Sequence, residues 1–173
     1  MLKDYGKIHR NSGIYAMTTT DDNKYLFTSS NKGELKQWDI EERRLLKDYT
    51  KKNVSIIFWS MVATKDSQNL FTAYHFGYLC QWNIKNQKLM KDYGKVHSFS
   101  ITSMMITNDN QYLLTSTKKG ELKQWLIKIK KITFIKKYMI VHSDNTTPMA
   151  ISNDNQTLYT GDASGQLRLW DMQ

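Results

Sequence analysis

Short stretches in which apolar and polar residues alternate with a period of two run along the whole chain. Residues 24–29 (Lys-Tyr-Leu-Phe-Thr-Ser) and 120–125 (Gly-Glu-Leu-Lys-Gln-Trp) are rich in residues that favour extended backbone. Clusters of Asn, Asp, Gly and Lys bound these stretches and supply turn chemistry. No segment of the sequence carries a convincing apolar stripe at helical spacing. The pattern therefore predicts short β-strands joined by tight turns.

These predicted strands recur with a period of about 44 residues. Each of four copies has a glycine five residues before a tryptophan, and the tryptophans lie 44, 43 and 45 residues apart. Two further residue types keep the same phase: the tyrosines Tyr5, Tyr49, Tyr93 and Tyr138, and the turn aspartates Asp22, Asp66, Asp109 and Asp154. We predict four strands per unit, in units of about 1–44, 45–88, 89–133 and 134–173, within a single domain. One such sheet cannot bury both of its faces, so neighbouring units are expected to stack.

The period, the glycine-to-tryptophan spacing and an upstream histidine resemble the WD-repeat β-propeller family over essentially the whole chain. The resemblance implies an all-β fold, a β-propeller built from four four-stranded antiparallel blades. It also implies a buried hydrogen-bond network in each unit that joins an aspartate, a histidine, a Ser/Thr and the tryptophan. Matched position by position, the members of this network are His9, His97, His142, Thr28, Thr72, Thr115, Thr160, Trp38, Trp82, Trp125 and Trp170.

The sequence departs from the family pattern within this network. The aspartate expected just before the glycine is replaced in every unit, by Lys32, Phe76, Lys119 and Ser164. We therefore expect no unit to hold the full network of four residues. The second unit also has Asn53 in place of the histidine, and aspartate follows the tryptophan only at Asp39 and Asp171. Because a partly satisfied buried network is less stable than a complete one, we expect modest stability, weakest around the second unit.

The order of strands leaves three possibilities for ring closure. Lys3–Lys7 matches Lys47–Lys51 and Lys91–Lys95, which predicts an outer strand at the start of the chain, whereas the fourth unit stops after its third strand. The chain could form a closed four-bladed ring, one half of an eight-bladed homodimer that exchanges these strands, or an open partial propeller. Propellers have about four to eight blades, and the family usually needs about seven. We therefore favour the dimer.

Composition narrows the classes of function. The chain has 173 residues, 40% of them hydrophobic, and its one cysteine, Cys80, is predicted to be a buried thiol in a third strand. The start of the chain does not resemble a signal peptide, and no apolar run could cross a bilayer, so we predict an intracellular protein, cytoplasmic rather than nuclear. Repeat phase explains His9, His97 and His142 without a metal, and His75 falls in a predicted turn. No phosphate-binding loop, paired metal-ligand motif or nucleophile elbow is present, so we expect no cofactor and no enzymatic activity.

The leading functional prediction is a scaffold or adaptor that binds other proteins through the loops on one face and around the central channel. Trp59 is the tryptophan that lies outside the repeating position. Its counterparts are Tyr15, Thr102 and Thr147, near the start of each innermost strand. An aromatic residue at such a rim is a candidate binding hot spot, with packing between blades as the alternative role.

The positive charge supports a second prediction. The net charge is +9, but only four of the 25 cationic residues are arginine, so a compositional bias toward lysine explains much of it. A basic stretch of the third unit and its outer strand contains Lys118, Lys119, Lys123, Lys128, Lys130, Lys131, Lys136 and Lys137. Lysines on an outer strand also prevent pairing with other chains. The alternative function is binding of nucleic acid or anionic lipid, for which steep salt dependence is the test.

Overall fold

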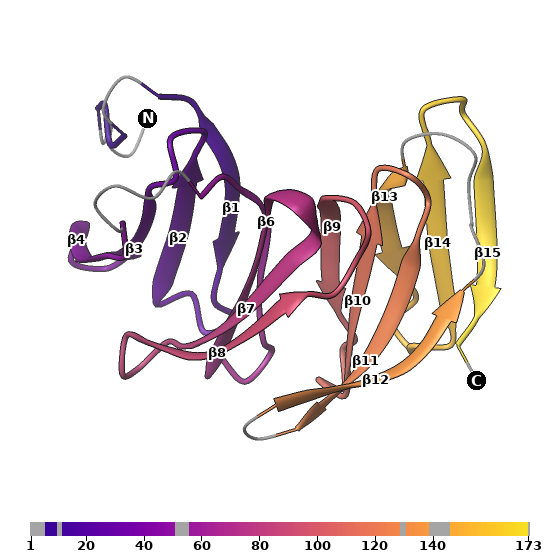
Figure 1. Cartoon of the computed structure of the whole chain (residues 1–173). Coiled ribbons are helices and arrows are strands. Elements are labelled where there is room, and N and C mark those ends of the chain that lie inside the picture. Colours follow the sequence, from indigo (N-terminus) through magenta and orange to yellow (C-terminus); the bar gives the residue numbers. More distant parts are fainter. Residues whose placement is uncertain (1–5, 10–11, 51–55, 129–130, 139–145, 173) are drawn as a thin grey trace.

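Four antiparallel sheets stand side by side in an arc, and each is one blade (Figure 1). The structure, a computed structural model, describes residues 6–9, 12–50, 56–128, 131–138 and 146–172. Blade 1 consists of β1 (Ile14–Thr19), β2 (Tyr25–Ser30), β3 (Leu35–Asp39) and β4 (Arg44–Asp48). Blade 2 consists of β5 (Phe58–Ala63), β6 (Asn69–Tyr74), β7 (Tyr78–Asn83) and β8 (Lys88–Lys95). Blade 3 consists of β9 (Ile101–Ile106), β10 (Tyr112–Thr117), β11 (Leu122–Lys128) and β12 (Lys131–Tyr138). Blade 4 consists of β13 (Thr146–Ile151), β14 (Thr157–Asp162) and β15 (Leu167–Asp171).

Within every sheet the strands pair in the order in which they occur along the chain. The innermost strands contact one another in a row, β1 with β5, β5 with β9 and β9 with β13. The helical content of the described residues is one short 3₁₀ turn, η1 (His75–Gly77), between β6 and β7. The predicted all-β fold of propeller blades is therefore confirmed.

The turn between the first and second strands of each blade is built in the same way. In blade 1, the Thr20 hydroxyl donates to the Asp22 carboxylate at 2.5 Å, and that carboxylate accepts from the Lys24 amide at 3.1 Å. The residue after the turn aspartate has positive φ in every blade: Asn23 in blade 1, Ser67 in blade 2, Asn110 in blade 3 and Asn155 in blade 4. Asparagine tolerates this conformation better than most residues, so in blades 1, 3 and 4 an Asp-Asn pair terminates the innermost strand.

These turns also tie each blade to the next. The Ser67 hydroxyl accepts from the Asp22 amide at 3.2 Å, and the Asn110 side-chain carbonyl accepts from the Lys65 amide at 3.0 Å. Asn155 accepts in the same way from the Asn108 amide, at 2.7 Å. The positive-φ residue of one blade thus serves as a hydrogen-bond acceptor for the turn of the preceding blade.

Each blade has two different faces. The Trp face carries the repeat tryptophan (Trp38, Trp82, Trp125 or Trp170), and the Leu face carries the leucine three residues before it (Leu35, Leu79, Leu122 or Leu167). Phe27 and Leu35 of the Leu face of blade 1 share a core cluster with Met61 and Leu70 of the Trp face of blade 2. The other two junctions repeat this pairing of faces. The core of the molecule is therefore divided among three blade-to-blade junctions.

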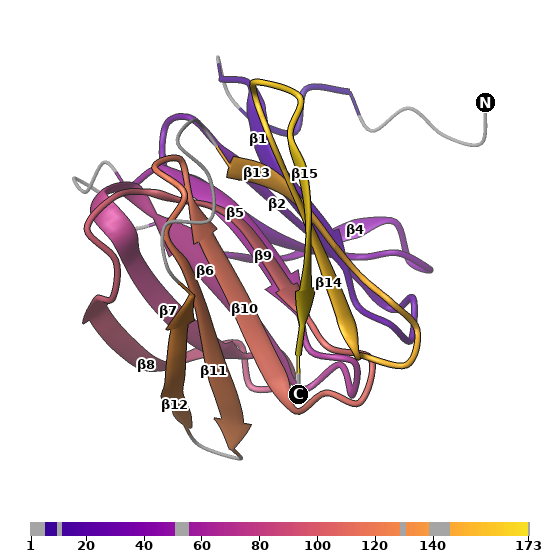
Figure 2. The ribbon, with the colours of Figure 1, turned by 90° about the vertical axis from the view of Figure 1, so that its right-hand side faces the viewer.

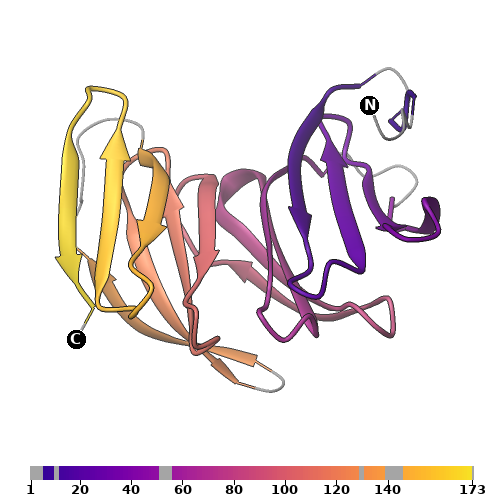
Figure 3. The same cartoon turned by 180° about the vertical axis from the view of Figure 1, so that it is seen from behind.

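The four blades do not close into a ring, so the closed four-bladed alternative is not what the structure shows. Figures 1 and 3 place blade 1 and blade 4 at opposite ends of the arc. In the view of Figure 2, the two end blades overlap on one side while the outer strands of blades 2 and 3 point to the other. Neighbouring blades approach most closely through their innermost strands, and the four sheets form an open arc (Figure 1).

The described part of blade 4 has three strands, in the order β13-β14-β15. The predicted outer strand at Lys3–Lys7 lies mostly outside the described residues, and its described members, Gly6 and Lys7, belong to no strand. The sheets are shifted by one strand from the repeat units, because the outer strand at the start of one unit completes the blade before it.

Candidate functional site

Two exposed aromatic side chains from neighbouring blades contact each other at one end of the arc's inner surface. Tyr15 in β1 and Trp59 in β5 have ring centroids 5.2 Å apart, with planes tilted by 42°. They remain 46% and 41% exposed. Of the other two counterparts, Thr102 is half-buried in β9, and the side chain of Thr147 in β13 lies outside the described residues. Sequence reasoning thus placed two aromatic residues that the fold brings together.

Two further aromatic residues lie at the same end of the strands. The start of β5 pairs with the end of β6, so the η1 turn with exposed Phe76 is on the Trp59 side of blade 2. Exposed Phe99 just precedes β9, and the hydroxyl of the adjacent Ser100 accepts from the Phe76 amide at 3.2 Å. We call Tyr15, Trp59, Phe76 and Phe99 the aromatic rim.

Phe76 and Phe99 were not predicted from the sequence as binding residues. A signal was available at Phe76, because the equivalent residues of the other units are Lys32, Lys119 and Ser164. His75, in the predicted turn, is half-buried, and its Nδ1 accepts from the Ile57 amide at 3.4 Å.

A chain of four buried or nearly buried side chains runs through blade 3. The Trp125 indole donates to the Thr115 hydroxyl at 2.9 Å, and Thr115 lies 2.7 Å from His97 Nε2. His97 Nδ1 lies 2.9 Å from the Glu121 carboxylate. Since a carboxylate only accepts hydrogen bonds, His97 donates to Glu121 through Nδ1. Its Nε2 then accepts a hydrogen bond from the Thr115 hydroxyl. With a neutral imidazole, each donor of this hydrogen-bond network has an acceptor.

Blade 1 has the same arrangement. The Trp38 indole donates to Thr28 at 2.9 Å, His9 Nε2 lies 2.9 Å from the same hydroxyl, and His9 Nδ1 lies 3.0 Å from Glu34. Lys36 donates to Glu34 at 3.1 Å and to the Ile8 carbonyl at 2.7 Å. The network therefore fixes the chain segment that enters the blade.

The expectation that no unit holds a network of four residues is wrong for blades 1 and 3. The carboxylate comes from the residue after the glycine, Glu34 or Glu121, and not from the residue before it. Glutamate has one more methylene than aspartate, so it reaches the histidine from a position further along the turn. The signal was present in the sequence, because residues 33–38 and 120–125 are the same hexapeptide.

Blade 2 lacks these polar partners as a set. Its tryptophan still donates to a threonine, Trp82 to Thr72 at 2.8 Å, but Tyr78 replaces the glutamate and Cys80 replaces the lysine. Asn53, which replaces the histidine, lies outside the described residues, as does His142 of the fourth unit. In blade 4, the Trp170 indole donates to Thr160 at 2.9 Å.

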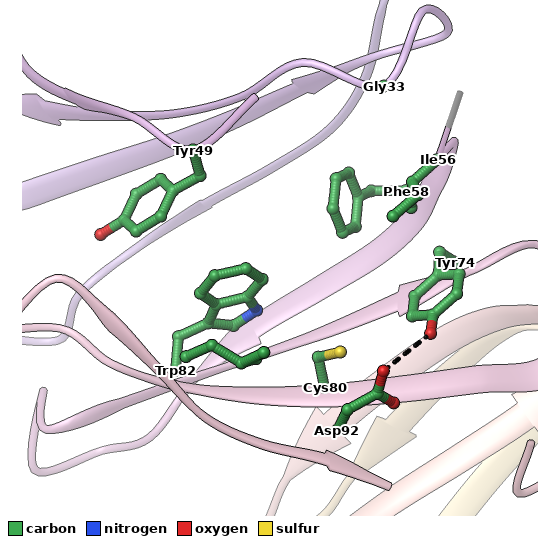
Figure 4. A pocket seen from close by; sticks show the side chains of 9 residues that line it. Gly33, Tyr49, Ile56, Phe58, Tyr74, Cys80, Trp82 and Asp92 are labelled. Carbon is green, nitrogen blue, oxygen red and sulfur yellow. Dashed lines mark hydrogen bonds between the residues drawn. The ribbon is translucent and has the colours of Figure 1, made fainter. Parts of the chain in front are cut away.

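A small cavity between blades 1 and 2 adjoins the altered positions. Its volume is about 50 Å³, and Tyr74, Cys80 and Trp82 contribute to its lining. Figure 4 shows Cys80 between Trp82 and the pair formed by Tyr74 and Asp92, whose hydroxyl and carboxylate are 3.3 Å apart. At the junction between blades 1 and 2, the side chains of Tyr74, Cys80 and Trp82 therefore pack where blade 3 has a polar network.

In the blade 3 network the pKa values of both His97 and Glu121 are lowered, but for different reasons. Burial lowers the pKa of His97 to about 4, although Glu121 acts to raise it. Burial raises the pKa of Glu121, but hydrogen bonds from His97 and Lys137 outweigh this effect and lower the pKa to about 2. The pKa of His9 is also lowered, mainly by burial. The networks are thus built for a neutral histidine and an ionised glutamate.

Acidification is therefore expected to destabilise the fold. The unfolded chain binds a proton at His97 below pH 6.5 and the folded chain only near pH 4, so stability falls as pH drops through this window. The full effect at His97 is about 3 kcal/mol, and Glu121 adds a loss in the same direction below pH 4.5. Urea unfolding across this pH range, compared with a His97→Gln variant whose amide does not titrate, measures the effect. Equal pH slopes for the two proteins would contradict it.

The residues of the basic stretch do not form one cluster. Lys118 and Lys119 are exposed in the turn before β11, and Lys136 and Lys137 lie near the end of β12, which pairs with the start of β11. Lys128 and Lys131 lie at the opposite end of this hairpin, about 20 Å away at the usual rise of a strand, and Lys130 is outside the described residues. Lys137 also forms an ion pair with Glu121 at 3.1 Å. Binding of nucleic acid or anionic lipid stays a prediction.

Within the described ranges, no group of three or more His, Cys, Asp or Glu residues could hold a metal ion. No helix in this part of the chain is long and apolar enough to span a membrane.

Comparison with known proteins agrees with the repeat and the fold. The family described as "WD domain, G-beta repeat" matches residues 5–39 and 138–171, each from a marker tyrosine to the aspartate after the repeat tryptophan. No curated protein matches the chain. The crystal structure of the computationally designed Ika4 protein is 16% identical in sequence and similar in fold, with a TM-score of 0.75 over 96% of this chain and 95% of that one. The two matched stretches confirm the predicted resemblance to WD repeats at these positions, and the shared fold confirms the β-propeller blades.

Proposed function

We propose that the chain is a non-catalytic scaffold that binds other proteins through its aromatic rim. WD repeats generally mediate interactions between proteins. The observation that carries the proposal is the contact between Tyr15 and Trp59, two large aromatic side chains that remain exposed although they come from adjacent blades. Tyrosine and tryptophan provide a large contact area at low cost in side-chain entropy, and tryptophan is enriched among residues that dominate binding energy.

The charge around the rim indicates the chemistry of the partner. Lys32 is exposed in the turn between β2 and β3, and Lys118 and Lys119 are exposed in the equivalent turn of blade 3. Both turns lie at the same end of the strands as Tyr15 and Trp59. A protein segment with an apolar or aromatic anchor and acidic flanking residues fits these features. We also infer that the chain acts inside the cell, in the cytoplasm, because a sequence with a single cysteine has no internal disulfide to form in an oxidising compartment.

Replacement of Trp59 by alanine is expected to weaken binding of the principal partner by at least about tenfold, because an aromatic anchor is lost. Partners captured on the tagged chain are quantified by mass spectrometry, and the affinity of the principal one is then measured by titration. Met90→Ala is the control, because Met90 is an exposed apolar residue of the outer strand β8, away from the rim. Equal losses in both variants, or unchanged binding to the Trp59→Ala protein with unaltered melting, would contradict the proposal.

A further inference from the structure

The three junctions between blades follow one rule, and the two ends of the arc present the matching halves of a fourth junction. On the Leu face, Leu35, Leu79 and Leu122 are all 0% exposed against the next blade. On the Trp face, Met61 and Met104 are only 7% and 8% exposed against the preceding blade. Leu35 shares a cluster with Met61, and Leu79 shares one with Met104. At these junctions, the Leu face of one blade therefore packs on the Trp face of the next blade.

At the ends of the arc the same positions are exposed. Leu167 of blade 4 occupies the place of the three buried leucines but is 67% exposed, and Leu169 beside it is 61% exposed. Met17 of blade 1 occupies the place of Met61 and Met104 but is also 61% exposed. Exposed apolar sheet faces of this kind mark sites of association.

We propose that two copies of this chain close into one eight-bladed ring, in which blade 4 of each copy packs its Leu face on the Trp face of blade 1 of the other. The chain itself supplies the matching face, so the occupant is a second copy. One chain cannot join its own two ends in this structure, since both remain exposed. A two-fold axis through the ring makes the two new junctions identical and leaves no apolar end face open.

The proposal predicts that both ends of each copy are used once, in two equal junctions. A lysine at Leu167 would place a charge in both junctions of a dimer and is expected to raise its dissociation constant by about 100-fold or more. A glutamate at Met17 would do the same from the other side. In a mixed dimer, one junction pairs the lysine with the glutamate and the other is unaltered, so mixing the two variants is expected to restore the dimer.

The test is the mass in solution by light scattering and sedimentation over a series of chain concentrations. The wild-type chain is expected at twice the 20.4 kDa of one chain, Leu167→Lys and Met17→Glu each as monomers, and their mixture again as a dimer. Ile135→Lys is the control and stays dimeric, because Ile135 is 46% exposed on the outer strand β12, away from both end faces. All three sites are exposed in a single chain, so a charge there does not disturb its core.

Two outcomes overturn the proposal. A wild-type chain that stays monomeric at high concentration, or a mass that keeps growing as chains add end to end, shows that the ring does not close. Failure of the mixed variants to dimerise, with each variant folded by circular dichroism, shows that the two end faces do not meet.

Discussion

Replacement of Gly77 by alanine is expected to destabilise the protein by about 3–5 kcal/mol. Gly77 has φ +85°, and an added Cβ would lie 2.3 Å from the His97 carbonyl oxygen and 2.7 Å from that of Phe99. Both atoms belong to the backbone that enters blade 3, where the His97 amide also donates to Gly77 O at 3.2 Å. The methyl group would therefore force blades 2 and 3 apart.

Gly94 in the outer strand β8 is the control, because it also has a positive φ, +68°, with nothing within 4 Å of an added Cβ. Gly94→Ala is expected to cost only about 1 kcal/mol, which is the strain of the left-handed conformation alone. Urea unfolding of both variants at one chain concentration gives the difference. If the two variants lose equal stability, the close approach at Gly77 does not have the proposed effect.

The second large effect is expected at Thr115, which is fully buried and joins two partners through one hydroxyl. Thr115→Val keeps the shape of the side chain but leaves the Trp125 indole N–H without an acceptor and His97 Nε2 without a donor. Each buried polar group left unsatisfied costs about 1–3 kcal/mol, so a total loss of about 2–5 kcal/mol is expected. The free energy of unfolding in urea measures it.

Thr72→Val provides the comparison within the same chain. Thr72 is equally buried and accepts the Trp82 indole, and no histidine of the described residues contacts its hydroxyl, so its loss is expected to be about half as large. If Thr72→Val costs as much as Thr115→Val, the histidine does not contribute to the network as described.

Most of the fold could be predicted because the sequence contains four copies of one local pattern. The glycine, the tryptophan and the turn aspartate each satisfy a local requirement of a hairpin, so their common period fixed the number of blades. The curvature of the arc could not be predicted in this way. It depends on how far apart Leu35 and Met61, or Leu79 and Met104, hold neighbouring sheets, and no periodicity encodes that distance.

The candidate site was only partly visible for a related reason. Trp59 could be selected because it breaks the repeat, but its contact with Tyr15 depends on the packing of β1 against β5. Glu34 and Glu121 were missed because the family pattern directed attention to the residue before the glycine. A carboxylate two positions further along the turn reaches the same histidine through its longer side chain. The histidine thus keeps a carboxylate partner, but the carboxylate comes from a different position of the turn.

The strand order described above also bears on how the chain acquires its structure. Every strand pairs with the strand directly before or after it along the chain, and each described blade packs on its neighbours in sequence. Loops that must close during folding are therefore short, which favours rapid folding for an all-β protein. Hairpins can nucleate in any blade and recruit the adjacent blade, so order spreads along the chain in steps of one repeat.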